Sequence, residues 1–299
     1  MTDGGLPRIG IVGLGIMGQA YARNLRAAGF EVVGFDVSTS ACAQLHDLGG
    51  RVAADARAVA EGVDHVLTVL ASVTVLESVI AELAPALRPG MIVAEMGTLP
   101  IDAKERARDV VAGQGASMLD CPVSGTGAQA AAADLVVFAS GDAADVATLR
   151  PAFDAIARDV RHVGDFGAGM KLKYVANLLV SVHNLAAAEA LLLAERSGLD
   201  LQTTFDAITA GAGTSRMLEV RGPMMIADTY EPATMKMDVY MKDVMLILEH
   251  AREAQCPVPL MAASLPYYSA GLAQGRGGQD TAALFAILRQ LSQNRSDTG

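Results

Sequence analysis

The sequence predicts a chain of two parts, an α/β half followed by an all-α half. Short β-branched runs alternate with helical windows as far as residue 163. Beyond Gly164–Gly167 only helical periodicity continues, beginning with a long apolar window at 168–197. A length of 299 residues is sufficient for two domains. We therefore expect one domain over residues 1–165 and an all-helical domain over 166–299, joined by a long interdomain helix.

The first half reads as strands and helices in alternation. Strands are expected at Arg8–Val12, Glu31–Phe35, Val66–Leu70, Met91–Glu95, Ser117–Asp120, Leu135–Ala139 and Val160–Val163. Helices are expected at Gln19–Ala28, Thr39–Leu48, Val73–Ala84, Ile101–Gln114 and Ala143–Ile156. Such alternation predicts a mostly parallel, doubly wound sheet covered on both faces.

The second half shows further helical windows near residues 200–210, 237–254, 258–274 and 281–292. No internal repeat is visible. The polar tail Asn294–Gly299 is expected to be frayed.

A glycine-rich turn follows the first strand and opens the first helix. It reads Gly13-Leu14-Gly15-Ile16-Met17-Gly18, and the next strand ends in Asp36. Strand, glycine turn, helix, strand and acid stand in the order of a dinucleotide-binding, Rossmann-type unit, with the helix N-terminus facing the pyrophosphate. The alternative is a βαβ turn that binds nothing, but the flanking elements favour the cofactor.

Asp36 also indicates which dinucleotide binds. A carboxylate at this position accepts hydrogen bonds from the ribose hydroxyls and repels a 2′-phosphate. Residues 37–50 contain no Arg or Lys that would pair with such a phosphate. The sequence therefore predicts NAD rather than NADP.

Composition excludes several classes of partner. The formal net charge of −10 argues against nucleic acid and against an anionic membrane surface. Three scattered cysteines and five histidines without ligand-like spacing predict no disulfide framework and no metal site. The N-terminus lacks the pattern of a signal peptide, and the apolar run 178–194 is interrupted by polar residues. A soluble, cytoplasmic protein is expected.

The long helix carries the most informative polar pair. Lys173 and Asn177 are four residues apart, and so share one face of a helix whose surroundings are apolar. Burial lowers the pKa of an amine, which would make Lys173 a candidate proton shuttle. Lys171 points to another face. The alternative is a lysine that extends its amine to solvent from an amphipathic helix.

The same helix is apolar around much of its circumference, which a second subunit or the other helices must cover. Small residues at 186–188 would permit close helix contact. We expect a homo-oligomer.

Two further segments are candidate site elements. Asp120–Gly127 follows a predicted strand and contains a Ser-Gly-Thr-Gly turn, whose hydroxyls and amides suit a carboxylate. An ordinary turn is the alternative. Met241-Lys242-Asp243 lies at the start of a predicted helix, where a solvated face is the default interpretation.

Four segments, in order, resemble the signatures of the β-hydroxyacid dehydrogenase family, the group that contains 3-hydroxyisobutyrate dehydrogenase, tartronate semialdehyde reductase and L-threonate dehydrogenase. They are GLGIMGQAYARNLRAAG at 13–29, DCPVSGTGAQAAAADL at 120–135, GAGMKLKYVANLL at 167–179 and YMKDVMLILEHA at 240–251. The similarity extends over essentially the whole chain. Residues 210–225 further resemble the L-threonate dehydrogenase branch.

The resemblance implies a role for each matching position. Cofactor contacts would come from Gly13, Gly15, Ile16, Met17, Gly18, Asp36, Leu70, Thr98 and Lys242, with Lys242 closing the site near the nicotinamide. Ser124, Gly125 and Thr126 would bind the substrate carboxylate. Lys173 would be the general acid/base, and Asn177 would orient the substrate. A homodimer or homotetramer is implied.

The chain departs from the family pattern at two places. Thr126 replaces a usual Gly, and Ala133-Asp134 replace a usual Gly-Thr. The first adds a side chain beside the carboxylate site, and the second lies where the family backbone often turns tightly.

The expected activity is NAD-dependent oxidation of the hydroxyl of a short hydroxy acid, 3-hydroxyisobutyrate-like or a C4 sugar acid such as L-threonate. One alternative is the same site run in reverse, as a reductase of a small semialdehyde such as tartronate semialdehyde. Imine reductases share the architecture, but Lys173 argues against that activity. A catalytically silent dinucleotide-binding scaffold is the alternative of another class. Thr214, Ser215 and Arg216 are candidates for specificity.

Overall fold

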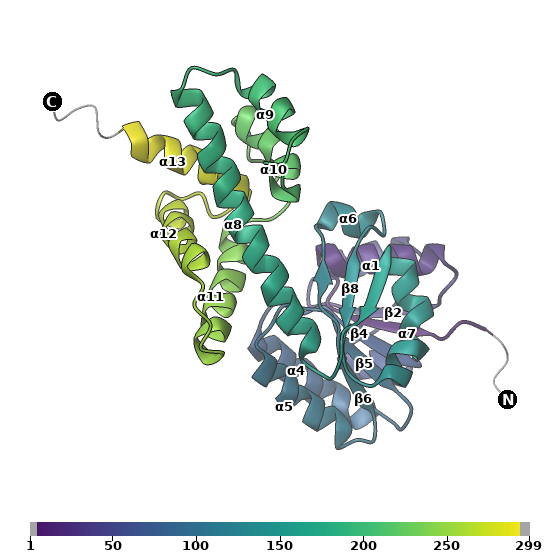
Figure 1. Cartoon of the computed structure of the whole chain (residues 1–299). Coiled ribbons are helices and arrows are strands. Elements are labelled where there is room, and N and C mark those ends of the chain that lie inside the picture. The colour runs from purple at the N-terminus through teal and green to yellow at the C-terminus, as the bar shows by residue number, and fades with distance from the viewer. Residues whose placement is uncertain (1–4, 294–299) are drawn as a thin grey trace. The chain divides into compact units, whose positions relative to one another are not determined.

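The computed structural model describes residues 5–293 (Figure 1), so the tail Asn294–Gly299 lies outside the described residues. The chain divides into two compact units, Met1–Lys173 and Tyr174–Gly299. The division falls inside one continuous helix, α8 (Ala168–Arg196). The sequence placed the change of architecture near residue 165, just before this helix begins.

A six-stranded sheet forms the centre of the first unit. All of its strand pairs are parallel, in the order β3-β2-β1-β4-β5-β6. The strands are β1 (Ile9–Val12), β2 (Val32–Phe35), β3 (Arg51–Val52), β4 (His65–Thr68), β5 (Ile92–Glu95) and β6 (Ser117–Asp120). This confirms the predicted parallel sheet and adds β3, which is too short to show a strand pattern in the sequence.

Helices cover both faces of this sheet, as its apolar strands require. They are α1 (Ile16–Ala27), α2 (Thr39–Asp47), α3 (Ala56–Glu61), α4 (Val73–Leu83) and α5 (Ile101–Ala112), with a short 3-10 helix η1 (Ala84–Ala86) after α4. Side chains on one strand alternate between the two faces. Ile9 and Ile11 therefore join Leu25 of α1 in one apolar cluster, whereas Val12 joins Val59 of α3 in another.

The last strands of the first unit form a second sheet, which corrects the prediction of a single sheet. β7 (Val123–Ser124) pairs antiparallel with β8 (Val136–Ala139), and β8 pairs parallel with β9 (Asp159–His162). After β6 the chain turns back through β7 and the short helix α6 (Gly127–Ala131), so it does not make the long crossover that a parallel neighbour needs. α7 (Ala143–Ile156) then connects β8 to β9.

Helices are the regular elements of the second unit among its described residues, as predicted, with one isolated β-bridge between Lys236 and Asp280. Besides its share of α8 it contains α9 (Leu201–Thr209), α10 (Arg216–Ile226), α11 (Met237–Glu253), α12 (Pro259–Ala273), the 3-10 helix η2 (Thr281–Ala283) and α13 (Leu284–Gln293). α11 packs against α12 and α12 against α13, while α9 packs against α10. α10 is an element that the sequence did not predict.

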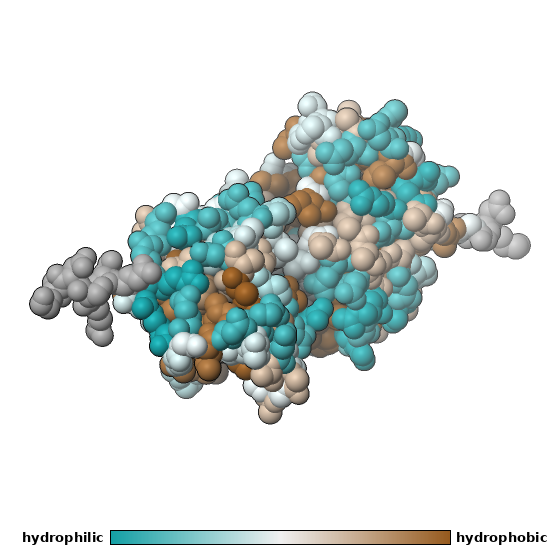
Figure 2. Space-filling view, turned by 90° about the horizontal axis from the view of Figure 1, so that it is seen from above, coloured by the Kyte–Doolittle hydropathy of each residue, from teal (hydrophilic) through white to brown (hydrophobic). Residues whose placement is uncertain are grey.

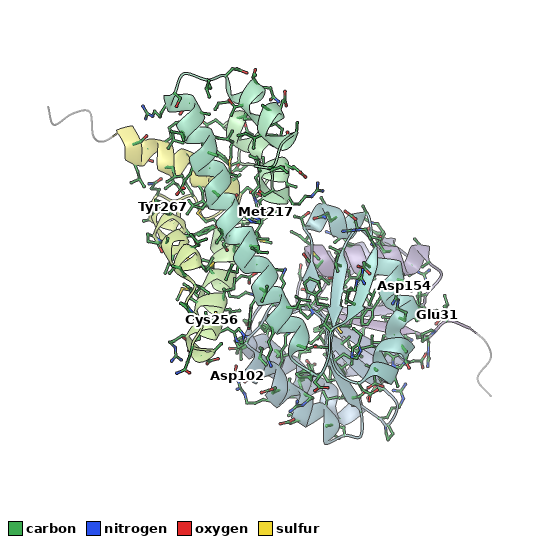
Figure 3. All side chains as sticks on the ribbon, in the orientation of Figure 1. Glu31, Asp102, Asp154, Met217, Cys256 and Tyr267 are labelled. Atoms are coloured by element: carbon green, nitrogen blue, oxygen red, sulfur yellow. The ribbon has the colours of Figure 1, made fainter. Side chains whose placement is uncertain are left out.

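The visible surface is largely hydrophilic, with hydrophobic residues scattered between (Figure 2). Acidic side chains such as Glu31, Asp102 and Asp154 lie on the surface of the first unit (Figure 3), in keeping with the net charge of −10. Cys256 is exposed in the connection between α11 and α12.

Candidate active site

The turn after β1 has the shape that a dinucleotide requires. Gly13 has φ +97°, and a Cβ there would overlap the carbonyl oxygen of Val69. A Cβ at Gly18 would overlap the carbonyl oxygen of Gly13, so the helix packs on the strand only because Gly18 has no side chain. At Gly15, the N-cap of α1, a Cβ would meet nothing within 4 Å. The backbone is therefore open where a pyrophosphate would approach the helix N-terminus.

Asp36 is fixed beside this turn by two backbone amides. Its Oδ2 accepts a hydrogen bond from the amide of Leu14 at 2.6 Å, and its Oδ1 accepts one from the amide of Ser38 at 2.8 Å. A carboxylate has about four lone-pair sites, so acceptor capacity remains for ribose hydroxyls. The glycine turn and Asp36 therefore have the geometry that NAD binding requires.

Two more predicted cofactor positions, Leu70 and Thr98, lie at the same edge of the sheet. Leu70 follows the carboxyl end of β4, and Thr98 follows that of β5. β4 is the neighbour of β1, and the carboxyl ends of parallel strands meet at one edge. Ile16 and Met17 form the first turn of α1, where Ile16 is exposed.

The Ser124–Thr126 turn connects β7 to α6. Gly125 has φ +142°, which favours glycine. Thr126 caps α6: its amide donates to Oε1 of Gln129 at 3.0 Å, and its hydroxyl accepts from the amide of Gln129 at 3.4 Å. The hydroxyl and amide of Thr126 therefore already have protein partners.

Gln129 connects both departures from the family pattern. Its Nε2 donates to Oδ2 of Asp134 at 3.2 Å, while its Oε1 accepts from Thr126. Asp134 also forms an ion pair with Arg158 at 2.8 Å. Ala133, which directly precedes Asp134, has φ +53°. Gln129 was not among the predicted site residues. The signal was present, because Thr126 followed three residues later by Gln129 is the spacing of a capping box.

Lys171 and Lys173, both in the first turns of α8, differ in burial. Lys173 is buried, with only 8% of its surface exposed, whereas Lys171 is exposed. The predicted distinction between their faces agrees with this burial.

In the second unit, Asp243 of the Lys242-Asp243 motif contacts Asn177, which lies one helical turn after Lys173. Asn177 donates from Nδ2 to Oδ2 of Asp243 at 2.9 Å, and both residues are buried. The hydroxyl of Tyr240 donates to the carbonyl of Asn177 at 2.9 Å. Lys242 is partly exposed, with its Nζ 3.9 Å from Oδ1 of Asp243. The default interpretation of a solvated charge pair is therefore wrong for Asp243.

Ser215, one of the specificity candidates, is the N-cap of α10 and accepts from the amide of Leu218. Thr214 and Arg216 both contact Glu219 on the same helix. These contacts are local to the start of α10.

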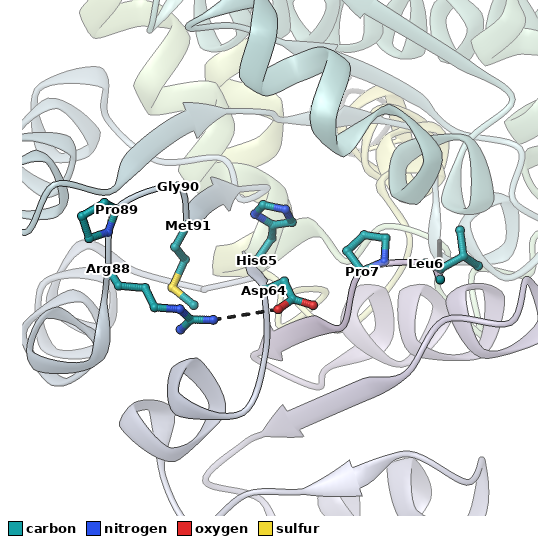
Figure 4. A pocket seen from close by; sticks show the side chains of 9 residues that line it. Leu6, Pro7, Asp64, His65, Arg88, Pro89, Gly90 and Met91 are labelled. Carbon is teal, nitrogen blue, oxygen red and sulfur yellow. Dashed lines mark ion pairs between the residues drawn. The ribbon is translucent and has the colours of Figure 1, made fainter. Parts of the chain in front are cut away.

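A pocket of about 490 Å³ lies at the opposite edge of the sheet, where the strands begin (Figure 4). Its lining includes Asp64, His65 and Arg88. The polar groups are already paired, since Arg88 lies 3.9 Å from Asp64 and Nδ1 of His65 accepts from the amide of Ile92. Ligands of open α/β sheets bind at the carboxyl ends of the strands, so we do not place the active site here.

Within residues 5–293, no group of three or more His, Cys, Asp or Glu could hold a metal ion. α8 is long and apolar enough to cross a membrane by length and composition alone. Core helices of soluble proteins share this length and composition, so neither property distinguishes a membrane span.

Comparisons with known proteins agree with this geometry. Residues 8–164 match the model of the NAD binding domain of 6-phosphogluconate dehydrogenase. Residues 167–288 match a model described as NAD-binding of NADP-dependent 3-hydroxyisobutyrate dehydrogenase. L-threonate dehydrogenase of Cupriavidus necator is 35% identical, over 93% of this chain and 95% of that protein.

Solved structures show the same relationship. 3-Hydroxyisobutyrate dehydrogenase of Salmonella typhimurium has a TM-score of 0.85 and 33% identity, covering 94% of this chain and 99% of that one. The Mycobacterium tuberculosis 3-hydroxyisobutyrate dehydrogenase, solved with L-serine, has a TM-score of 0.88 and 27% identity, covering 95% and 100%.

Fold, glycine turn and relatives together define an NAD(P)-dependent oxidoreductase that acts on hydroxyl groups. The chain belongs to the β-hydroxyacid dehydrogenase family. It is accordingly an NAD-dependent hydroxy acid dehydrogenase with a small substrate.

Proposed function

We propose that this enzyme oxidises the hydroxyl group of a short hydroxy acid, a four-carbon sugar acid such as L-threonate or a 3-hydroxyisobutyrate-like acid. The observation that carries the proposal is the burial of Lys173 at the start of α8, one turn before the anchored amide of Asn177. The relatedness to L-threonate dehydrogenase supports the four-carbon acid.

Each residue has a role in this reaction. The amine of Lys173, neutral before the step, removes the hydroxyl proton as hydride leaves the carbinol carbon. Ser124, Gly125 and Thr126 hold the carboxylate, and Asn177 orients the hydroxyl-bearing carbon. Asp243 fixes the amide of Asn177 in one orientation, so the donor and acceptor of that amide are not interchanged. When bound, NAD⁺ supplies the hydride acceptor.

The cofactor is held by Gly13, Gly15, Ile16, Met17, Gly18, Asp36, Leu70 and Thr98, with Lys242 near the nicotinamide. Asp36 selects NAD over NADP, since its carboxylate would repel a 2′-phosphate. The first domain then spans residues 1–165 and binds NAD, and the domain at 166–299 supplies substrate contacts and oligomerisation.

The enzyme is further proposed to be a cytoplasmic homodimer or homotetramer without nucleic-acid or membrane partners. The acidic charge supports the last point, and exposed apolar side chains on the helices of the second unit support self-association.

The test is a panel of initial rates. Purified enzyme is assayed for NADH formation with L-threonate, D-erythronate, glycerate and 3-hydroxyisobutyrate, and each reaction is repeated with NADP⁺. We expect turnover of one or two acids with NAD⁺ and a much lower kcat/KM with NADP⁺. Binding of NAD⁺ without turnover of any acid, or of semialdehydes in the reverse direction, would support the silent scaffold instead.

A further inference from the structure

A buried charge cluster that the proposed reaction does not use lies at the carboxyl ends of β5 and β6. Glu95, Lys104 and Asp120 are all completely buried. The ammonium of Lys104 lies 2.5 Å from Oε2 of Glu95 and 2.6 Å from Oδ1 of Asp120, and it donates to the carbonyl of Gly97 at 2.8 Å. The amine of Lys104 therefore has three oxygen neighbours and hydrogen-bonds to two of them, Oδ1 of Asp120 and the carbonyl of Gly97.

Charge states follow from these contacts. Burial opposes the charged form of Lys104, but the two carboxylates outweigh it and raise the pKa of the amine. Burial also raises the pKa of Glu95, against the attraction of Lys104.

Asp120 extends the cluster to the beginning of α8. Its second oxygen, Oδ2, accepts a hydrogen bond from the amide of Met170 at 2.9 Å. The hydroxyl of Ser140 donates to the backbone carbonyl of Asp120 at 2.9 Å, lies 3.2 Å from Oδ2 of Asp120, and accepts from the amide of Gly169 at 2.9 Å. These amides belong to the first turn of α8, whose amides have no acceptor within the helix. A carboxylate oxygen that accepts a hydrogen bond from such an amide is a suitable cap for the beginning of a helix.

The cluster thus connects three segments that carry proposed site residues. Glu95 lies three residues before Thr98, and Asp120 lies four residues before Ser124. Met170 precedes Lys173 by about one helical turn.

We propose that Asp120, which is held by Lys104, and Ser140, which bonds to Asp120, are positioning residues that fix the first turn of α8 and thereby place the amine of Lys173 relative to the Ser124 turn. This inference rests on the proposed function for its catalytic consequence. Misplacement of a reacting group by about 1 Å can cost about a hundredfold in rate. A cluster with only a structural role would affect folding and leave the chemical step unchanged.

The experiment uses Ser140→Ala, which removes the acceptor of the Gly169 amide and leaves the three residues of the cluster in place. Asp120→Asn is the second variant. Ser264→Ala is the matched control, because Ser264 is also fully buried and bonds locally to the carbonyl of Met261. The measurements are kcat, KM for NAD⁺ and the isotope effect with substrate deuterated at the carbinol carbon.

We expect kcat of Ser140→Ala to fall about ten- to a hundredfold. KM for NAD⁺ should stay within about twofold, since the turn at Gly13–Gly18 is untouched. The isotope effect on kcat should rise, because hydride transfer becomes slower than the other steps. Ser264→Ala should lower the urea midpoint and keep the wild-type kcat and isotope effect. If Asp120→Asn does not fold, Ser140→Ala decides the question.

Wild-type kcat and isotope effect in Ser140→Ala would overturn the proposal. Hydrogen exchange separates this failure from a failure of the proposed function, because it needs no substrate. Even if wild-type enzyme oxidises none of the acids, the amides of Gly169 and Met170 should lose protection in Ser140→Ala, while those of the first turn of α1 should not. Unchanged protection at Gly169 would contradict the positioning role whatever the substrate.

Discussion

At the scale of single residues, Ala133 shows what a departure from a family pattern costs. Its φ of +53° lies in the left-handed region, where an L-residue other than glycine is disfavoured by about 1–2 kcal/mol. The neighbouring contacts among Thr126, Gln129 and Asp134 hold the backbone there.

Ala133→Gly should therefore stabilise the enzyme. The strain released exceeds the extra flexibility that glycine gives the unfolded chain, which costs about 0.4–1 kcal/mol, so a net gain of about 0.5–1 kcal/mol is expected. Urea denaturation followed by circular dichroism measures it. The control is Ala132→Gly, because Ala132 has φ −95° and should lose stability. Equal effects of the two variants would refute the account of strain at Ala133.

Residue identities were the part of the site most accessible to sequence analysis. Helical spacing placed Lys173 and Lys171 on different faces, and the glycine turn gave the positions of Gly13, Gly15 and Gly18, whereas the burial of Lys173 came from the structure. What the sequence could not provide was the partner of each polar group. The contact of Asn177 with Asp243 joins residues 66 positions apart, and the cluster of Glu95, Lys104 and Asp120 joins two strands and a helix.

At the scale of elements, length decided what the sequence could reveal. Ala143–Ile156 was predicted with the bounds of α7, and long helices such as α8 and α12 were predicted to within a residue or two. α3 and α6, with six and five residues, are too short to show a periodic pattern, because most of their stability comes from tertiary packing. α10 contains Gly222 and Pro223, which interrupt the helical signal.

In the second unit, one buried ion pair connects α10 to the segments before α11 and α13. Asp280 lies 3.2 Å from Arg221 and also accepts from the amides of Met235 and Ala282 and from Thr234. Burial alone would raise the pKa of this carboxyl, but the charge of Arg221 and the amide donors outweigh it, and the pKa is lowered.

Asp280→Asn should destabilise the second unit by about 3 kcal/mol, because Arg221 remains buried without a charged partner. The sign with pH follows from the lowered pKa of Asp280. The contribution of Asp280 to the free energy of unfolding is present above the pKa of an aspartate in the unfolded chain, about 3.9. This contribution is lost as pH falls below that value toward the lower pKa of the folded state. Between pH 3 and 7, the free energy of unfolding measured with urea should fall less steeply with decreasing pH in Asp280→Asn than in wild type. Parallel curves would contradict the assignment.

At the scale of the whole molecule, exposed apolar side chains call for a partner surface. Val175, Leu179 and Leu193 on α8 and Leu260 on α12 are all exposed. The proposed homo-oligomer would bury such residues, and each fully buried leucine contributes about 1.5–3 kcal/mol.

Sedimentation equilibrium should therefore give a dimeric or tetrameric mass at micromolar concentration. Leu193→Glu should shift the equilibrium toward monomer. Leu199→Glu is the control, since Leu199 is similarly exposed but lies beyond the end of α8. A monomeric wild type at every concentration would contradict the proposed assembly.

The central claim is that Lys173 is the general acid/base of a hydroxy acid dehydrogenase, and one comparison tests it most directly. Lys173→Ala and Lys171→Ala are measured side by side for NAD⁺ affinity and for kcat with the best acid of the panel. Loss of a general base is typically worth about 10²–10⁴ in rate. We expect Lys173→Ala to lose at least a hundredfold in kcat with unchanged NAD⁺ affinity, while Lys171→Ala keeps wild-type turnover. Turnover within a fewfold of wild type in Lys173→Ala would contradict the account.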